Sequence, residues 1–497
     1  MSLRLFILFL FSGLFTLTSQ ASVSWTLSDS TEVKKEYKGK PILIELIEVS
    51  GNAKTKDFVI FREMEFAVGD SMSVPDFLLR MEQSEKNIRN TQLFLEVSVF
   101  LTKLSNDRAQ ITVYVRERFY HAPVPVFKLV DRNFNVWLQD YNLDFSRITY
   151  GITYKAMNIR GRNETLTLGF NLGFNQTIHA SYDIPFIGKR PLGLLTYFKA
   201  DRTKSIAVAT VDDKLEFLSD DDFVRTYFQF GAVSNYRQSL YNTHFLGLQY
   251  MHTKVADTIL LENPLYLQSG QTKQDFFQFS YRFQRDRRDR IVYPTTGNFW
   301  SFEFEKLGLG IFNDINFFNL YGNYIQYFDP GANFFLSSQF RFKTSAPNDQ
   351  PYFNQQGLGY RENFVRGYEL YVVDGQHYGL FKLNIKNRLL SYKMQSSKFL
   401  NDNRYEGLPF EFYLKAHFDA GYVVDNYHNA FNNLSNSWLL GGGVGLDLVL
   451  PYNLVLRLEY SAIRYFDGDR SYLENGLYLH FNIALQDFMQ VKNRIYP

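Results

Sequence analysis

The feature that most constrains this chain is a series of long segments in which apolar and polar residues alternate one by one. In residues 277–284 aromatic side chains alternate with Gln, Ser and Arg, and residues 412–419 alternate in the same way. A period of two is that of a β-strand, whose successive side chains point to opposite faces. One face of rings and aliphatic groups opposite one face of charges suits a lipid-facing wall around a polar lumen.

Composition separates this interpretation from the alternative of a soluble β-sandwich, which also alternates because its charged face meets water. The chain has 34 Tyr, 49 Phe and 4 Trp among 497 residues, and strands this long and this aromatic favour a membrane barrel. The absence of Cys excludes disulfides, thiolate metal sites and Cys nucleophiles. A net charge of +2 gives no overall field for nucleic acid, so no nucleic-acid partner is expected.

About sixteen alternating segments reach the ~10 residues that a tilted membrane strand requires. Their predicted starts are Ile148, Asn163, Asn175, Pro191, Ser205, Phe223, Tyr241, Asp275, Gly297, Ile315, Asn333, Tyr378, Pro409, Trp438, Asn453 and Gly476. The boundaries within 191–256 and 390–409 are left open. With an N-terminal domain in the periplasm, odd-numbered connections lie outside, which places the longest one, about 344–378, on the external side.

The N-terminus has the pattern of a secretory signal peptide, predicted over residues 1–21. Arg4 is followed by an apolar run and by the small-residue cleavage pattern that ends at Ala21. No run of 18 or more apolar residues follows, so no transmembrane helix is expected. The chain is therefore expected to be exported, and residues 22–40 are assigned to a linker.

Residues 41–119 have a mixed pattern that predicts a small β-α-α-β-β domain. An alternating strand ends at Gly51, Thr55 is placed to cap the first helix, and a second helix follows Pro75. Two further strands complete the unit, and it carries neither a His cluster nor a Gly-rich phosphate loop. Its strand edges could bind an extended partner chain. Residues 120–146 are assigned to a second linker and residues 147–497 to the barrel.

Two motifs stand out against the strand pattern. The first lies between the predicted eighth and ninth strands and contains Asp286, Arg288, Asp289, Pro294 and Gly297. Pro294 and Gly297 favour a tight turn, and the charges taken alone are typical of a solvated run at a strand end. The second is Val365, Arg366, Gly367 and Tyr368 in the long predicted external loop, where a lone Arg is ordinarily solvated.

Together these motifs resemble those of the BamA/TamA superfamily of outer-membrane assembly proteins, which combine periplasmic POTRA domains with a sixteen-stranded barrel. The resemblance makes residues 41–119 a single POTRA and makes Val365–Tyr368 the signature of the sixth external loop. It implies that this loop folds into the lumen and that Arg366 pairs with an acid on the inner wall. Asp419, on the polar phase of its strand, is the predicted partner. The stretch Ile385–Arg388 lacks the acid that relatives often carry, so a second carboxylate is not expected.

The resemblance implies a function in the assembly or transport of proteins, without a catalysed reaction. The chain is expected to be an insertion factor that templates client β-barrels at a seam between the first strand, near Ile148, and the last. The alternative is a translocation pore dedicated to one secreted or surface-exposed partner, and a passive porin-like channel fits the POTRA-like domain poorly. The expected partners are unfolded outer-membrane clients, membrane lipid and accessory assembly subunits, in the outer membrane of a diderm bacterium with the POTRA-like domain in the periplasm.

No enzymatic activity, cofactor or metal is expected. The acids at Asp212, Asp213 and 220–222 show no regular ligand spacing and are interpreted as a solvated loop. The glycines at 441–445 lie within a predicted strand, whereas a nucleotide loop requires a turn from a strand into a helix. His417 is interpreted as a polar residue of the luminal wall.

Overall fold

A computed structural model describes residues 41–129, residue 137 and residues 142–483, apart from 189, 268–269, 313–314, 361–362, 394–408, 428–431, 451–453 and 468–469. The predicted signal peptide and first linker, residues 1–40, lie outside the described residues, as does most of the connection left open at 390–409. None of the helices that the structure describes is long and apolar enough to cross a membrane.

The N-terminal domain is a small α/β unit. Its elements are β1 (Ile42–Ser50), α3 (Asp57–Phe61), β2 (Ser71–Met72), α4 (Val74–Asn90), β3 (Phe94–Ser105) and β4 (Arg108–Glu117). The sheet has the order β2-β1-β4-β3, with β1 parallel to β4. Inward positions of these strands are fully buried, as at Ile44 and Val113. The expected β-α-α-β-β order is present, with β2 as an addition.

The first helix of this domain differs from the prediction. Lys56, and not Thr55, occupies the N-cap position and makes no side-chain capping bond. Thr55 instead donates its hydroxyl to the Glu117 carboxylate at 2.5 Å. The helix is short and ends at Phe61.

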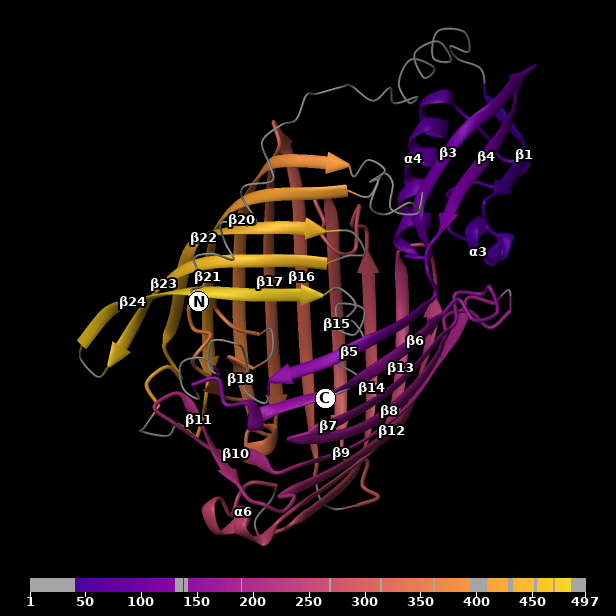
Figure 1. Cartoon of the computed structure of the whole chain (residues 1–497). Helices are drawn as coiled ribbons and strands as arrows, with labels where there is room; N and C mark the ends of the chain where they lie inside the picture. Colours follow the sequence, from indigo (N-terminus) through magenta and orange to yellow (C-terminus); the bar gives the residue numbers. More distant parts are fainter. Residues whose placement is uncertain are drawn as a thin grey trace. The chain divides into compact units, whose positions relative to one another are not determined.

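The largest sheet among the described residues has sixteen antiparallel strands (Figure 1). Its members in chain order are β5 (His121–Leu129), β6 (Ile148–Met157), β7 (Thr165–Gly173), β8 (Asn175–Ile184), β9 (Leu192–Thr203), β12 (Arg225–Arg237), β13 (Asn242–Val255), β14 (Lys273–Asp286), β15 (Gly297–Leu307), β16 (Phe317–Gly331), β17 (Phe334–Ala346), β20 (His377–Lys393), β21 (Pro409–Val424), β22 (Trp438–Leu450), β23 (Leu454–Asp467) and β24 (Arg470–Ile483). Each strand pairs with its neighbours in this order, and β5 and β24 are the two end strands.

The exposure of apolar and charged side chains on the two faces of this sheet is the reverse of that in a water-soluble protein. On β21 the apolar Leu414 and Phe418 are 48% and 45% exposed, whereas the alternating Lys415 and Asp419 are 3% and 0% exposed. A soluble sandwich would expose the charges and bury the rings, because burial of unpaired charge is costly. The charged face is therefore the interior of a barrel, and the apolar face is its outer wall.

The structure corrects the predicted strands at two places. The sheet begins at β5, within the segment assigned to the linker 120–146, so the strand predicted near Ile148 is the second. Among the residues that the structure describes, the segment that begins at Ser205 pairs only with β11 (Lys214–Ser219), as strand β10 (Ser205–Val211) of a separate hairpin. These two errors cancel in the count, so the numbering of the later strands holds.

The β10–β11 hairpin carries its own apolar cluster. Ile206 and Val208 of β10 pack with Val224, Val255 and the short helix α6 (Asp257–Glu262) through Ile259. The segment Pro347–Gln376 between β17 and β20, here called the long loop, contributes Tyr352 and Phe353 to the same cluster. The long loop contains the 3-10 turn η2 (Tyr352–Asn354) and the strands β18 (Gln356–Leu358) and β19 (Val373–Asp374). Another 3-10 turn, η1 (Phe145–Arg147), precedes β6.

Candidate functional site: a luminal ion-pair network

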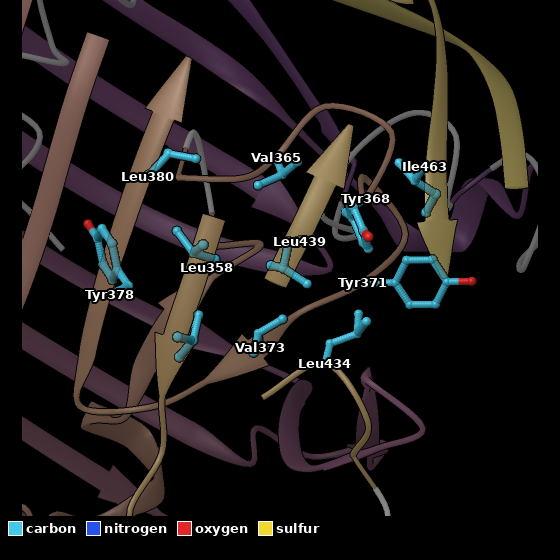
Figure 2. Close-up of a cluster of buried hydrophobic side chains, with 11 residues drawn as sticks. Leu358, Val365, Tyr368, Tyr371, Val373, Tyr378, Leu380, Leu434, Leu439 and Ile463 are labelled. Carbon is cyan, nitrogen blue, oxygen red and sulfur yellow. The ribbon is translucent and has the colours of Figure 1, made fainter. Parts of the chain in front are cut away.

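The long loop packs against the inner wall formed by β20 to β23. Figure 2 shows Val365 and Tyr368 of the loop among Leu380, Leu439 and Ile463 of the wall, and all five side chains are at most 2% exposed. The Tyr368 hydroxyl also donates to the backbone carbonyl of residue 464 on β23, at 2.7 Å. Apolar packing on this scale contributes to the docking of the loop on the wall.

Arg366 lies between these two anchors and is held by the barrel wall. Its Nε donates to the Asp419 carboxylate at 2.8 Å, its Nη2 donates to the other oxygen at 2.5 Å, and its backbone N–H donates to Asp419 at 3.0 Å. Its Nη1 donates to the side-chain oxygen of Asn384 at 2.6 Å and lies 3.4 Å from the Glu459 carboxylate. The structure thus brings together the two residues predicted to pair.

The charge of Arg366 is kept by its partners. Burial acts to lower the pKa of Arg366, but the bonds from Asp419 and the nearby Glu459 outweigh it and raise the pKa above the usual value. A two-point fork of this kind is available to a guanidinium and not to an ammonium group. Replacement by Lys would therefore keep the charge and lose the geometry.

Glycines make room for the loop at this position. Gly367 has φ of +99°, and a Cβ there would lie 2.1 Å from the Ile463 side chain. On the wall, a Cβ at Gly441 would lie 2.1 Å from the backbone oxygen of Arg366. Both positions therefore require glycine, one for its backbone conformation and both for the close approach of loop and wall.

The second motif forms a structured turn between β14 and β15. Asp286 accepts bonds from Arg288 Nε and Nη2 at 2.9 and 2.6 Å, and Asp289 accepts from the hydroxyl of Thr295 at 2.6 Å. Gly297 has φ of +94°, and a Cβ there would lie 2.0 Å from a backbone oxygen. Charges at a strand end are typically solvated when taken alone, but here Asp286 and Arg288 are paired within the turn, and the Arg288 side chain is only 11% exposed.

The turn also reaches the luminal wall. Tyr293, which is 2% exposed, packs its ring 4.7 Å from that of Tyr413 and donates its hydroxyl to Asp447 at 2.8 Å. Arg290 donates to Glu411 at 3.0 Å. Pro294, between these contacts and Gly297, is itself buried. The turn is thus anchored to β21 and β22, the strands that also carry the partners of the long loop.

A single chain of contacts links the two motifs across the wall. Glu459 lies 3.4 Å from Arg366 and 2.5 Å from Lys415, and Lys415 lies 2.9 Å from Asp447, the acceptor of the Tyr293 hydroxyl. Lys415, Glu459 and Asp447 are all at most 3% exposed. Such a network holds groups in place and specifies position more than it adds net stability, because desolvation offsets much of the attraction.

The sequence did not predict every residue of this network. A second carboxylate for Arg366 was not expected, because β20 has none, yet Glu459 on β23 supplies it. Glu459 lies on the polar phase of its strand, so the alternation does place its side chain on the luminal face. Its proximity to Arg366 depends on the register of β21 to β23, which the alternation does not define.

The acid-rich segment contains one residue that is not solvated. Asp212 and residues 220–222 are exposed, as expected, but Asp213 is fully buried. Its carboxylate accepts the backbone N–H groups of Asn433 and Leu434, each at 3.1 Å. Asp213 thereby joins the β10–β11 hairpin to the connection between β21 and β22. Among the described residues, no group of three or more His, Asp or Glu could hold a metal ion.

His417 lies on the polar face of β21, at 6% exposure, with Nε2 3.0 Å from the Ser461 hydroxyl. It is a hydrogen-bonded wall residue next to the network. The network has a mechanical role, because it holds the long loop and the turn against the same wall.

Comparison with known proteins agrees with this geometry. The model of the Omp85 superfamily domain matches residues 158–483. The fold is similar to that of BamA from Haemophilus ducreyi lacking POTRA domains 1–3, at 14% identity and a TM-score of 0.50, over 88% of this chain and 85% of that one. It is also similar to CdiB from Escherichia coli, at 10% identity and a TM-score of 0.52, over 88% and 75% of the two chains. A search of the curated proteins gives no match.

The family match covers well over half of the chain and most of the strands that carry the network. It supports a role in outer-membrane protein insertion or secretion, the two activities expected from the sequence motifs. The chain belongs to the Omp85 superfamily, with its sixteen-stranded barrel in the outer membrane.

Proposed function

We propose that this protein is a non-enzymatic assembly factor that inserts client β-barrels into the outer membrane. The observation that carries the proposal is the sheet order, in which β5 and β24 are the two end strands. An unpaired strand edge in lipid is costly, so a nascent barrel needs an edge on which to pair. A seam between β5 and β24 supplies such an edge when it opens. This replaces the seam predicted near Ile148, because β5 precedes that strand.

The luminal network supports insertion over passive diffusion. Val365 and Tyr368 pack the long loop on the inner wall, and Arg366 pairs with Asp419 inside the lumen. A loop docked on the inner wall would narrow a passive channel. In this proposal, the loop holds β20 to β23 as a rigid wall. The end strands β24 and β5 change their pairing at the seam while this wall stays in place.

Residues 41–119 are proposed to be a single periplasmic POTRA domain. Its sheet ends in β3, a strand of twelve residues, and an edge of that length could pair with an extended client. Clients would be unfolded outer-membrane proteins, and lipid and accessory subunits would be further partners. No cofactor or metal has a part in this mechanism.

The experiment that tests the proposal is quantitative proteomics of the outer membrane and of the culture medium after depletion of this protein. A fall in many unrelated barrels is the expected result. Loss of a single protein from either fraction would contradict general insertion and would indicate a dedicated translocation pore.

A further inference from the structure

A row of polar and cationic side chains lies on the outer wall of the barrel, at one end of five neighbouring strands. The registers of β8, β9, β12, β13 and β14 (Figure 1) join Gln176, Arg202, Thr226, Lys254 and Lys273. This set is here called the cationic row. All but Gln176 are exposed, whereas the alternating Thr203, Thr253 and Gln274 are buried on the luminal side. Each member is the outward residue nearest to that end of its strand.

This end of the barrel also carries the long loop. β9 and β12 are connected here through the β10–β11 hairpin, and β13 and β14 are connected through α6. The hairpin and α6 pack with Tyr352 and Phe353 of the long loop. With the N-terminal domain in the periplasm, as proposed above, this end faces the exterior. The cationic row then lies where the outer wall meets the headgroups of the outer leaflet.

The first group of cations in the row lies on β9. The Arg202 guanidinium is 4.1 Å from the centre of the Phe223 ring, and its Nε donates to the side-chain oxygen of Gln176 at 2.9 Å. Lys204, just beyond the end of β9, lies 5.8 Å from the same ring. An amide and a ring orient a guanidinium without neutralising it, so the charge of Arg202 remains available to an anion.

The second group consists of two lysines that face each other. Lys254 of β13 and Lys273 of β14 are direct register partners, and like charges at such positions are destabilising. The next outward residue on β14, Asp275, accepts the Tyr250 hydroxyl at 2.5 Å and lies 2.7 Å from Nδ1 of His252. One carboxylate that is already bonded to two neighbours compensates at most one of the two ammonium groups. An external anion would relieve the remaining repulsion.

The spacing of the two groups suits a ligand with two anionic groups. β12 separates β9 from β13, so Arg202 lies two strand spacings from Lys254 and three from Lys273. At about 4.8 Å per strand, these separations are roughly 10 and 14 Å. The exposed Thr226 lies between the groups and offers a hydroxyl to a polar moiety that joins two phosphates.

An apolar surface continues from the row along the same strands. The rings of Phe198, Phe228 and Tyr250 follow one another across β9, β12 and β13, with centroids 5.3 and 6.2 Å apart. Phe277 of β14 extends this series, 5.4 Å from Tyr250. Phe230, which is 49% exposed, lies against Tyr250 at 5.6 Å. Acyl chains of a lipid whose headgroup occupies the row would lie along these rings.

The cations are a local feature of the barrel rim. On β21 and β22, the outward residues near the same end are Tyr422 and Trp438, whose rings lie 5.2 Å apart. The register continues from Tyr422 to Gly379 on β20, so this part of the rim carries no charge in its outward row. Aromatic rings alone are the ordinary boundary of a membrane barrel. The positive charge on β9, β13 and β14 therefore needs a separate explanation.

We propose that the cationic row, together with Lys204, binds a phosphorylated glycolipid of the outer leaflet. One phosphate occupies the group formed by Arg202 and Lys204, and a second phosphate occupies the group formed by Lys254 and Lys273. The sugar lies over Thr226 between them. A glycerophospholipid has a single phosphate and reaches only one group at a time. This site goes beyond the insertion of clients and uses only the periplasmic placement of the N-terminal domain from that proposal.

Lipid binding to the purified full chain tests the site without any insertion assay. Native mass spectrometry in detergent compares lipid A that carries two phosphates with phosphatidylglycerol. The exposed acids at residues 220–222 adjoin Phe223 in the sequence, so Lys254 and Lys273 give the cleaner test. Lys254→Gln with Lys273→Gln should weaken lipid A binding by about tenfold or more. Unchanged affinity in this variant, or equal affinity of the wild type for both lipids, would overturn the inference.

A matched control removes two outward cations elsewhere on the barrel. Arg285 of β14 lies opposite Trp300, and Lys306 of β15 lies opposite Phe279, six residues along β14 from Lys273. That offset is about 20 Å, well beyond the screening length. Arg285→Gln with Lys306→Gln should therefore bind lipid A within about twofold of the wild type. A loss as large as that of the Lys254 and Lys273 variant would mean nonspecific attraction and would overturn the site.

Cysteine labelling tests the leaflet, because the chain has no native Cys. Asp212 is exposed in the β10–β11 hairpin, at the same end as the cationic row, and Asp329 is exposed near the β16–β17 turn at the other end. A membrane-impermeant maleimide should label Asp212→Cys in intact cells and Asp329→Cys only after lysis. The opposite pattern would place the row at the inner leaflet and overturn the inference.

Discussion

Replacement of Arg366 by Ala should release the long loop from the luminal wall. The guanidinium makes two bonds to Asp419 and one to Asn384, and Asp419 is fully buried. After the substitution, the Lys382 ammonium remains, with its Nζ 3.9 Å from Asp419. Removal of one partner of a buried pair typically costs about 3–5 kcal/mol, because the other charge is left with weaker compensation.

The docked state of the loop should therefore lose about 3–5 kcal/mol relative to the undocked state. At about 1.4 kcal/mol per tenfold change, the ratio of docked to undocked loop falls by roughly two to three and a half orders of magnitude. The apolar anchors Val365 and Tyr368 remain, so the barrel itself should still fold. Arg366→Lys should lie between Ala and wild type, because it keeps the charge and loses the fork.

Limited proteolysis of the long loop in liposomes measures this opening. The rate of cleavage within residues 347–376 should rise strongly in Arg366→Ala and less in Arg366→Lys. Asp419→Ala combined with Arg366→Ala should cost less than the sum of the two single changes, because no unpaired charge remains. A cleavage rate in Arg366→Ala equal to that of the wild type would refute the role of Arg366 as a lock.

Three further changes test the surrounding contacts. Gly441→Ala should also speed loop cleavage, because its Cβ would lie 2.1 Å from a loop backbone oxygen; Gly442→Ala, with nothing nearer than 3.4 Å, is the control and should be neutral. Tyr293→Phe should lower the free energy of unfolding by about 1–3 kcal/mol in a urea titration, since its buried carboxylate partner loses a donor; an unchanged midpoint would contradict this. Asp213→Asn should expose the connection between β21 and β22 to protease, whereas the exposed Asp212→Asn should not, and equal cleavage of both variants would argue against the contact.

The barrel could be predicted from the sequence because its signal is local. Alternation in a strand such as β21 reports which side chains share a face, and the reversed burial of Leu414 and Asp419 agrees with it. The end strand β5 was missed because Pro123 and Pro125 interrupt the usual strand composition. Those prolines are tolerated there because the strand has only one neighbour in the sheet order.

Other features depended on pairing, which a single strand does not encode. Residues 205–211 alternate like a barrel strand, but β10 has only seven residues, fewer than the ~10 of a membrane span, and it pairs within its own hairpin. The loop motif and the alternation of β21 together predicted that Arg366 pairs with Asp419. Glu459 and Lys415 were not, because their contacts depend on the registers that join three strands.

The seam can be tested most directly by closing it with a reversible disulfide. A cysteine at Phe127 on β5 is combined in turn with one at each odd-numbered position of β24, and the pair that oxidises most completely is reconstituted in liposomes. Client insertion should stop in the oxidised protein and return after reduction, while the single-cysteine variants insert at the wild-type rate under both conditions. Insertion that continues at the wild-type rate with the seam fully oxidised would contradict templating at the seam.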